Sequence, residues 1–198
     1  MKAVIATKNR GKLKELQNLL ADFDLQIVPL DQFDNIGEIE EDGVTFFDNA
    51  MKKARTVAER TGLMAIADDS GLEVEALNGR PGVFSARYAG EKASDQENYL
   101  KLLQEMKDVP DDKRDAQFRC VIVAYRPDGK WVSAEGICRG RITHAPKGNQ
   151  GFGYDPIFIP EGDSRTMAQL TQEEKNRISH RGKALLELRE KIKQLMGN

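Results

Sequence analysis

Residues 3–12 read Ala3-Val4-Ile5-Ala6-Thr7-Lys8-Asn9-Arg10-Gly11-Lys12. The first four are apolar, as in a buried strand, and the next six are polar. Leu13, Leu16 and Leu20 then lie on one face of a helical pattern. A helix N-terminus offers unpaired backbone N–H groups and a partial positive charge, so the cationic side chains here favour a phosphate-bearing ligand. An ordinary strand-to-helix connection with solvated lysines is the alternative.

Length and composition restrict the class of protein. A chain of 198 residues favours one domain covering 1–198, and 39% hydrophobic with 31% charged residues is typical of a globular protein. Thirty Lys and Arg against 32 Asp and Glu argue against a binder of nucleic-acid polymers. No apolar run is long enough to span a membrane, and no leader pattern opens the chain, so we expect a cytoplasmic protein that does not bind membranes.

The chain has two cysteines, Cys120 and Cys138, and two histidines. Too few of these residues exist for a zinc site, and a disulfide is not expected among reduced cytoplasmic thiols. A bound metal would be a hard cation held by carboxylates, such as Mg²⁺.

Two acidic stretches could supply those carboxylates. Asp68-Asp69-Ser70-Gly71 follows the apolar run 63–67, and we expect it to form a loop at the carboxyl end of a buried strand, where ligands gather in α/β sheets. A simple Asx-turn is the alternative. The acidic loop, residues 31–43, is either a magnesium loop or a solvated one.

Turn and capping signals indicate the remaining architecture. Thr45 begins a helix that ends at Gly62, and Ser94 and Thr171 open capping boxes for two more. Residues 127–129 form the turn of a hairpin, whose strands must be antiparallel. The predicted fold class is α/β, with a mixed sheet flanked by helices.

Polyphosphate chemistry accounts for the polar stretches together: the basic loop at 7–12, the aspartate pair, the glycine-aromatic loop at 151–155 and the basic turn at 175–183. A P-loop NTPase is the obvious competitor. It is excluded, because Ala6 replaces the first glycine of that motif and Leu13 replaces its metal-binding hydroxyl.

Five motifs together resemble those of the inosine triphosphate pyrophosphatase family, in the family's order and over nearly the whole chain. They are Thr7-x-Asn9-x-Gly11-Lys12, Ala67-Asp68-Asp69-Ser70-Gly71-Leu72, Pro81-Gly82-Val83-x-Ser85-Ala86-Arg87-Tyr88, Gly151-Phe152-Gly153-Tyr154-Asp155-Pro156 and Ser179-His180-Arg181-Gly182. The resemblance implies a Mg²⁺-dependent enzyme that hydrolyses inosine, deoxyinosine and xanthosine triphosphates to the monophosphate and pyrophosphate. It further implies a homodimer, and an elongated twisted sheet with two lobes and a central cleft.

The resemblance also implies residue roles. Asp69 binds Mg²⁺ and is the base for the attacking water, Asp68 supports the metal, and either Glu40 or Glu41 supplies a further carboxylate. Phe152 stacks on the base, and His180 with Arg181 reads the 6-oxo group of the purine. The full set implied to bind substrate is Thr7, Lys8, Asn9, Arg10, Gly11, Lys12, Ser70, Phe152, Gly153, Tyr154, Asp155, Lys175, His180 and Arg181.

Two other functions stay open from the sequence. A nucleotide phosphotransferase would need an acceptor and would not release pyrophosphate from triphosphate and water. A non-catalytic nucleotide sensor would leave the triphosphate intact, and a carboxylate pair beside phosphates disfavours it.

Overall fold

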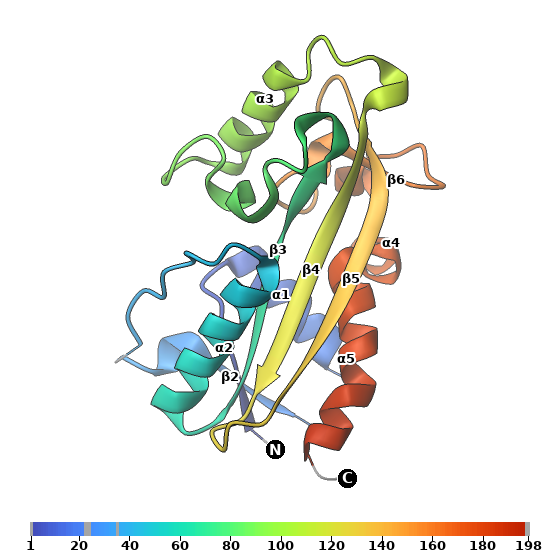
Figure 1. Cartoon of the computed structure of the whole chain (residues 1–198). Helices are drawn as coiled ribbons and strands as arrows, with labels where there is room; N and C mark the ends of the chain where they lie inside the picture. The colour runs from blue at the N-terminus through green and yellow to red at the C-terminus, as the bar shows by residue number, and fades with distance from the viewer. Residues whose placement is uncertain (1, 22–24, 35, 197–198) are drawn as a thin grey trace. The chain divides into compact units, whose positions relative to one another are not determined.

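The computed structural model describes residues 2–21, 25–34 and 36–196 (Figure 1). It divides into two compact units, each made of separate stretches of chain. Unit 1 comprises the described residues up to 69, with 120–136 and those from 181 onward, and unit 2 comprises 70–119 and 137–180. The chain passes between the units four times. Three of these passages lie within the long strands β3 (Met64–Val74), β4 (Asp115–Tyr125) and β5 (Trp131–Ile142), and the fourth lies between His180 and Arg181.

Six strands form one mixed sheet in the order β2-β1-β3-β4-β5-β6. The other three strands are β1 (Lys2–Ile5), β2 (Gln26–Pro29) and β6 (Phe158–Pro160). β1 runs parallel to β2 and β3, whereas β5 and β6 are antiparallel. The predicted α/β class with a mixed sheet is confirmed. Two compact units agree with the expected two lobes, and the central cleft stays a prediction.

Unit 1 packs three helices on its strands: α1 (Arg10–Leu20), α2 (Phe46–Thr61) and α5 (His180–Met196). Leu16 of α1 and Leu188 of α5 share one core cluster with Ile5 and Ile66 of the strands. Successive strand residues point to opposite faces of the sheet, so Val4 and Ala65 lie on the face opposite to Ile5 and Ile66. In Figure 1, α2 lies in front of these strands and α1 behind them.

Unit 2 contains α3 (Asp95–Glu105), α4 (Gln172–Ile178) and β6 around a second core that includes Leu72, Leu102, Phe118 and Phe158. Short 3₁₀ segments occupy Leu30–Gln32, Glu75–Leu77, Gly82–Arg87, Asp111–Lys113, Asp155–Ile157 and Met167–Gln169. Within the described ranges, no helix is long and apolar enough to cross a membrane.

The predicted caps are confirmed. Thr45, Ser94 and Thr171 each accept a hydrogen bond from the N–H three residues on, and Gly62 ends α2 at φ 65°. A left-handed residue at that point is the common way for a helix to end, and glycine adopts it without strain.

Three predicted boundaries were wrong. Residues 68–71 do not form a loop but lie inside β3, because the buried aspartates find cationic partners and the strand can continue through them. α1 begins at Arg10, so the polar loop is shorter than expected. The helix expected to begin at Thr171 is followed by a break and a second helix, since Ser179 has an extended ψ of 153° between α4 and α5.

Arg114 is a buried cation that holds unit 2 together, and its replacement gives a stability test. Its guanidinium donates to the carbonyls of Met106, Val109, Ile142 and Thr143 at 2.8–3.1 Å. The planar guanidinium reaches four acceptors at once, whereas a lysine ammonium has three donors on a single nitrogen. Arg114→Lys therefore leaves buried carbonyls without a donor. We expect the free energy of unfolding, measured by urea denaturation, to fall by about 2–4 kcal/mol.

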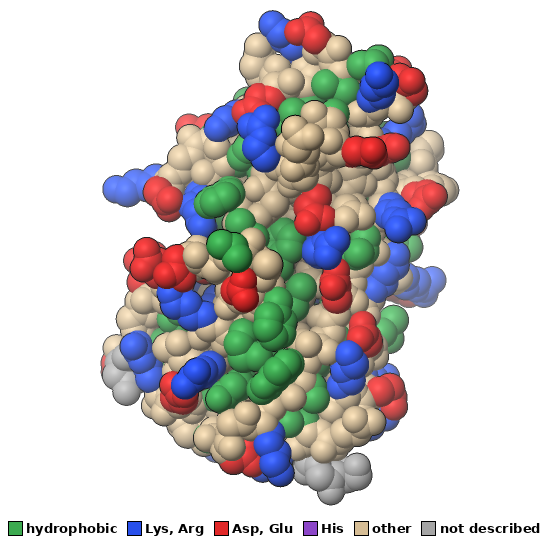
Figure 2. All heavy atoms as spheres, viewed as in Figure 1, with side chains coloured by type: hydrophobic (Ala, Val, Ile, Leu, Met, Phe, Trp, Pro, Cys, Tyr) green, Lys and Arg blue, Asp and Glu red, His purple; other side chains and the backbone are tan. Residues whose placement is uncertain are grey.

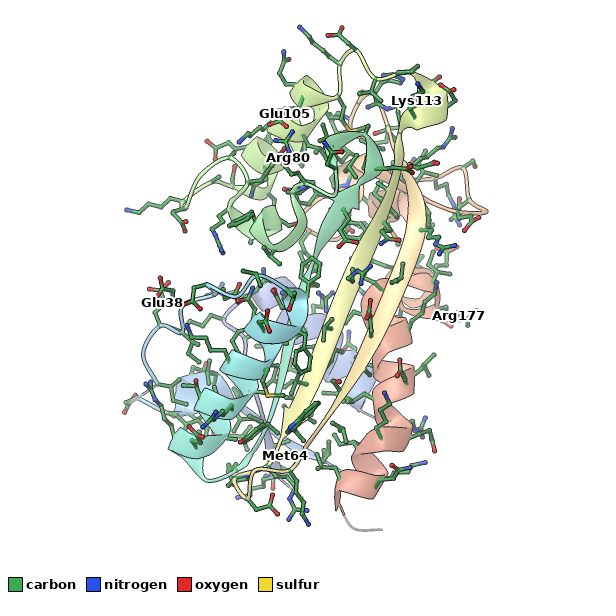
Figure 3. The ribbon with its side chains drawn as sticks, in the orientation of Figure 1. Glu38, Met64, Arg80, Glu105, Lys113 and Arg177 are labelled. Atoms are coloured by element: carbon green, nitrogen blue, oxygen red, sulfur yellow. The ribbon has the colours of Figure 1, made fainter. Side chains whose placement is uncertain are left out.

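The matched control is Arg177→Lys. Arg177 points outward from α4 in Figure 3, and its side chain is 74% exposed and paired with Glu173. An exposed pair of this kind contributes under about 1 kcal/mol, so the control should unfold close to wild type. Equal stability of both variants would contradict the assigned role of Arg114.

Candidate active site

The connection from β1 to α1 is a short capped turn. Asn9 is the N-cap, and its Oδ1 accepts the Lys12 N–H at 3.0 Å. The Thr7 hydroxyl oxygen accepts the Asn9 N–H at 3.2 Å. Lys8 and Arg10 are exposed, whereas Gly11 and Lys12 are half-buried in the first turn of α1. The turn therefore combines a helix N-terminus with three cations, as the sequence predicts.

Lys12 reaches into a buried charge cluster in unit 1, which we call the Asp68 cluster and which comprises Lys12, Glu15, Asp68 and Arg181. Lys12 Nζ lies 3.2 Å from Asp68 Oδ2, and Arg181 donates to the same oxygen at 3.1 Å through Nη2. The other end of the guanidinium donates to Glu15. Asp68 is 0% exposed and Arg181 is 1% exposed, so these charges depend on one another.

Electrostatics keep the Asp68 cluster ionised. Burial by itself would raise the pKa of Asp68, but the charges of Lys12, Arg181 and Lys53 outweigh it, and the pKa lies well below its ordinary value. Burial would likewise lower the pKa of Lys12 and of Arg181, yet Asp68 and its acidic neighbours raise both.

The neighbouring Asp69 faces a different environment. Asn49 Nδ2 donates to Asp69 Oδ2 at 3.0 Å, and Lys53 Nζ lies 3.9 Å from Asp69 Oδ1. Both partners come from α2. Burial raises the pKa of Asp69, assisted by Glu41 and opposed by Lys53 and Lys12. Two adjacent carboxylates thus have pKa values shifted in opposite directions, a pattern found where acid–base roles are divided.

Glu41 is the acidic-loop residue that the structure brings to Asp69. Its Oε1 lies 2.5 Å from Lys53 Nζ, so one ammonium group contacts both Glu41 and Asp69. Glu40 is exposed, and Glu38 points outward from the loop in Figure 3. In the part of the chain that the structure describes, no group of three or more potential ligands is preformed around a metal position. Glu41 and Asp69 therefore supply two carboxylates to the Lys53 ammonium, which also donates to the Asp68 carbonyl at 2.7 Å.

In unit 2, Asp155 organises the glycine-aromatic loop. Its Oδ2 accepts the Phe152 N–H at 2.9 Å and the Lys175 ammonium at 2.6 Å. A side chain at Gly151, where φ is 77°, would lie only 2.0 Å from that oxygen, which explains the glycine. The Gly153 N–H donates to Asp95 at 2.7 Å. Asp155 is 3% exposed, so its carboxylate shapes this loop from inside.

Two aromatic contacts place the other predicted residues of unit 2. Lys175 Nζ lies 4.8 Å from the centroid of the half-buried Phe152 ring. His180 stacks on Phe118, with ring centroids 4.8 Å apart and planes 13° apart. Ser70 is half-buried next to Asp69 in the chain.

Other motif residues are structural. The Ser85 hydroxyl accepts the Leu72 N–H at 2.9 Å, and the Ser85 carbonyl accepts the Tyr154 hydroxyl at 2.8 Å. Burial, and then Glu105, raises the pKa of Tyr88 to about 12; the Tyr88 hydroxyl donates to that carboxylate. Arg80 points toward the same Glu105 (Figure 3), and its Nη1 lies 3.2 Å from Glu105 Oε2. These residues join β3 to the 152–154 loop and to α3.

Sequence reasoning missed Asn49, Lys53, Glu15 and Phe118. Lys53 is charged and lies off the apolar stripe of α2, a pattern typical of a solvated side chain, yet it is only 7% exposed. A usable signal existed: Asn49 and Lys53 are four residues apart and so share a face of the helix. Nothing in the sequence marked Phe118, which reads as an ordinary core residue of β4.

Comparison with known proteins gives the family. The sequence profile of the Ham1 family matches residues 3–191. The chain belongs to the Ham1 family. It is 52% identical to the dITP/XTP pyrophosphatase of Desulforamulus reducens, over 98% of this chain and 97% of that protein. It is 53% identical to the dITP/XTP pyrophosphatase of Escherichia coli O157:H7, over 93% and 94%. The resemblance found in the sequence is therefore confirmed.

Solved structures of Ham1 proteins have the same fold. The HAM1 protein from Coxiella burnetii superposes with a TM-score of 0.89 at 44% identity, covering 98% of this chain and 99% of that one. The Ham1 protein of Staphylococcus aureus gives 0.87 at 40% identity, with the same coverage of each chain. The Ham1 fold thus extends over essentially the whole chain.

The Asp68 cluster gives a pH-dependent stability test. Because the folded pKa of Asp68 is depressed, its stabilisation is present above the unfolded pKa of about 3.9 and is lost as pH falls toward the folded pKa. Removing one partner of a buried ion pair costs about 3–5 kcal/mol, so Asp68→Asn should lower stability by that amount at pH 7.

The difference between Asp68→Asn and wild type should shrink as pH is lowered below about 4, measured by urea unfolding at several pH values. Asp163→Asn serves as the control: the pKa of Asp163 is also lowered, by hydrogen bonds from Arg165, but that pair is at the surface. A constant difference between pH 7 and pH 3 for Asp68→Asn would refute the ionised, stabilising role.

Proposed function

We propose that this Ham1-family chain hydrolyses the non-standard purine triphosphates ITP, dITP and XTP to the monophosphate and pyrophosphate, and so removes them from the nucleotide pool. The observation that carries the proposal is the set around β3: a phosphate-binding turn and Lys12 on one side, and the Asp69–Glu41–Lys53 group on the other. The names of the relatives, at about half identity over nearly the full chain, support the substrate class. The chain is proposed to act as one domain.

The triphosphate is gripped by the turn at 7–12. The N-terminus of α1 offers backbone N–H groups, and Lys8 and Arg10 extend from it into solvent. Lys12 adds an ammonium whose raised pKa keeps it charged. Thr7, Asn9 and Gly11 shape the turn, and Ser70, beside Asp69 in the chain, is proposed to contact the same substrate.

Mg²⁺ is the proposed cofactor, and the donor set fits it. Glu41 and Asp69 supply carboxylate oxygens that already face a cation, the Lys53 ammonium, and a hard cation prefers such ligands with water completing its shell. When bound, the ion neutralises phosphate charge and polarises phosphorus. Asp68 is proposed to support this metal group indirectly, because it precedes Asp69 in the chain and binds Lys12. Glu40, which is exposed, becomes the weaker alternative to Glu41.

Asp69 acts as general base. It accepts a proton from a water whose oxygen attacks the α-phosphorus, and the bond from that phosphorus to the bridging oxygen breaks to release pyrophosphate. Burial raises the pKa of Asp69, which makes its carboxylate more basic than an exposed aspartate. Lys12 and the N–H groups of α1 hold the charge of the leaving group.

Base recognition is assigned to unit 2. Phe152 stacks on the purine, with Gly153, Tyr154 and Asp155 fixing its loop and Lys175 held above its ring. His180, held flat on Phe118, donates to the 6-oxo group. Arg181 belongs to unit 1, and its guanidinium binds Asp68 and Glu15. It is proposed to support His180 as the next residue in the chain. An adenine amino group would leave such donors unpaired, and that costs heavily in a closed site.

A homodimer and a cytoplasmic location complete the proposal. Figure 2 shows apolar side chains gathered beside α2 on unit 1. Trp131 is 46% exposed and packs against Phe47 with ring centroids 5.6 Å apart, and patches of this kind commonly meet a partner. Cys120 and Cys138 are buried and not joined in a disulfide, which suits a reducing compartment.

Pyrophosphate release tests the function. The purified protein with Mg²⁺ should convert ITP, dITP and XTP to monophosphate and pyrophosphate, while ATP and GTP react far more slowly. Asp69→Asn should lower kcat/KM by about 100-fold or more, because a general base is lost. Asp42→Asn, an exposed acidic-loop change that removes only the pair with Lys52, is the control.

The outcomes separate the rival functions. Consumption of the triphosphate only in the presence of an acceptor, with the phosphoryl group transferred to that acceptor and no pyrophosphate released, would indicate a phosphotransferase. Tight binding of intact ITP with no product would indicate a sensor. Near-full turnover by Asp69→Asn would remove Asp69 from the mechanism while leaving the activity itself in place.

A second test separates the two candidate glutamates. Glu41→Gln should raise the Mg²⁺ concentration needed for half-maximal activity by about tenfold or more, because it removes one of two carboxylate ligands. Glu40→Gln changes the adjacent, exposed residue and should behave as wild type. Calorimetric Mn²⁺ binding by both variants checks the result without turnover, and the reverse order would assign the ligand to Glu40.

A further inference from the structure

We propose that Asn49 is a positioning residue that ties the acidic loop to Asp69, so that the carboxylates of Glu41 and Asp69 are held together before a divalent cation binds. The inference deepens the proposed function and rests on its assignment of Glu41 and Asp69 as the metal ligands. Asn49 belongs to none of the sets of residues that the sequence motifs single out.

One amide group makes both connections. Asn49 Oδ1 accepts the Gly43 N–H at 2.8 Å, and Asn49 Nδ2 donates to Asp69 Oδ2 at 3.0 Å. The side chain is buried, with 1% of the residue exposed. A buried amide with its donor and acceptor both used has one orientation only, so Asn49 fixes the loop backbone and the Asp69 carboxylate relative to each other.

Gly43 shows how closely the loop is held. A Cβ at this position would lie 2.7 Å from Asn49 Oδ1 and 2.7 Å from the Asp48 Cβ, closer than real Cβ atoms approach. Gly37, in the same acidic loop, has nothing within 4 Å of the corresponding position. The absence of a side chain is therefore needed at the point where the loop meets Asn49, and not at Gly37.

α2 contacts the loop a second time, one helical turn further on. Lys53 bonds Glu41 at 2.5 Å and the backbone carbonyl of Asp68 at 2.7 Å. Lys53 holds the Glu41 side chain by charge, and a metal ion would compete with it for that carboxylate. Asn49 holds the backbone and carries no charge, so its grip on the loop persists when a cation binds. Preorganising ligands in this way is the usual contribution of residues behind a metal site.

The test is direct Mn²⁺ binding to the nucleotide-free full chain, followed by the paramagnetic resonance signal of the free ion. Asn49→Ala removes both hydrogen bonds, and Gly43→Ala pushes the loop off Asn49 without substituting either proposed ligand. Each should weaken Mn²⁺ binding by about 10–100-fold, the range measured for residues behind metal ligands. At saturating metal, kcat for ITP should fall while KM stays close to wild type, because the phosphate and base groups are untouched.

Two matched controls isolate the effect. Asn98→Ala removes a buried amide of unit 2 that also accepts one backbone N–H, from Ala89, and donates to one carbonyl, of Ala86, so it imposes a similar structural cost away from the site. Gly37→Ala adds a methyl group to the same loop in open space. Both should bind Mn²⁺ as wild type does.

Wild-type Mn²⁺ affinity in folded Asn49→Ala would overturn the inference. If that variant does not fold, Gly43→Ala decides, and wild-type affinity there overturns it equally. Weakening by Asn98→Ala to the same degree would show a general effect of lost stability and would also overturn it. A wild-type chain that hydrolyses ITP without binding Mn²⁺ would refute the metal assignment and this inference together, while the proposed activity would stand.

Discussion

The structure of unit 1 depends on a negative charge buried in the middle of a strand. An isolated carboxylate there would cost several kcal/mol, and the strand could not continue through it. Lys12, from the first turn of α1, and Arg181, from the first turn of α5, both bind Asp68 and remove that cost. The two helices are thereby fixed at their N-terminal ends, and their leucines complete the core shared with Ile5 and Ile66. The position of the turn at 7–12 follows from the same ion pairs.

The alternation of side chains along the strand explains why two adjacent aspartates have pKa values shifted in opposite directions. Alternate residues of a strand share a face, so Asp68 lies on the same face as Ile66 and points toward α1 and α5. Asp69 lies on the same face as Ala67 and points toward α2. On one face two cations lower the pKa of the carboxyl group. On the other, an amide and a more distant ammonium leave burial dominant, and the pKa rises. A stable anion and a candidate base thus arise from neighbouring residues with the same side chain.

Local signals made much of this fold predictable. The caps at Thr45, Ser94 and Thr171, and the helix end at Gly62, act within a few residues, and each was confirmed. The apolar run at 3–6 was likewise confirmed as a buried strand, which spans Lys2–Ile5. The strand through Asp68 was not predictable, because its partner Arg181 is more than a hundred residues away in the chain. The burial of Lys53 was not predictable for the same reason, because its partners Glu41 and Asp69 lie on other segments of the chain. The motifs singled out the candidate site residues, and the structure shows which side chains hold them.

The two faces of β3 place different demands on the same kind of side chain. The surroundings set each pKa: the charges of Lys12 and Arg181 outweigh burial and lower the pKa of Asp68, whereas burial on the α2 side raises the pKa of Asp69. The side facing α1 and α5 needs a permanent charge, because two buried cations require one. The side facing α2 can tolerate either protonation state, since Asn49 and Lys53 satisfy the oxygens without fixing the proton. A strand that passes between these two faces supplies both conditions with two consecutive residues, whereas a loop, as expected from the sequence, would not have separated them.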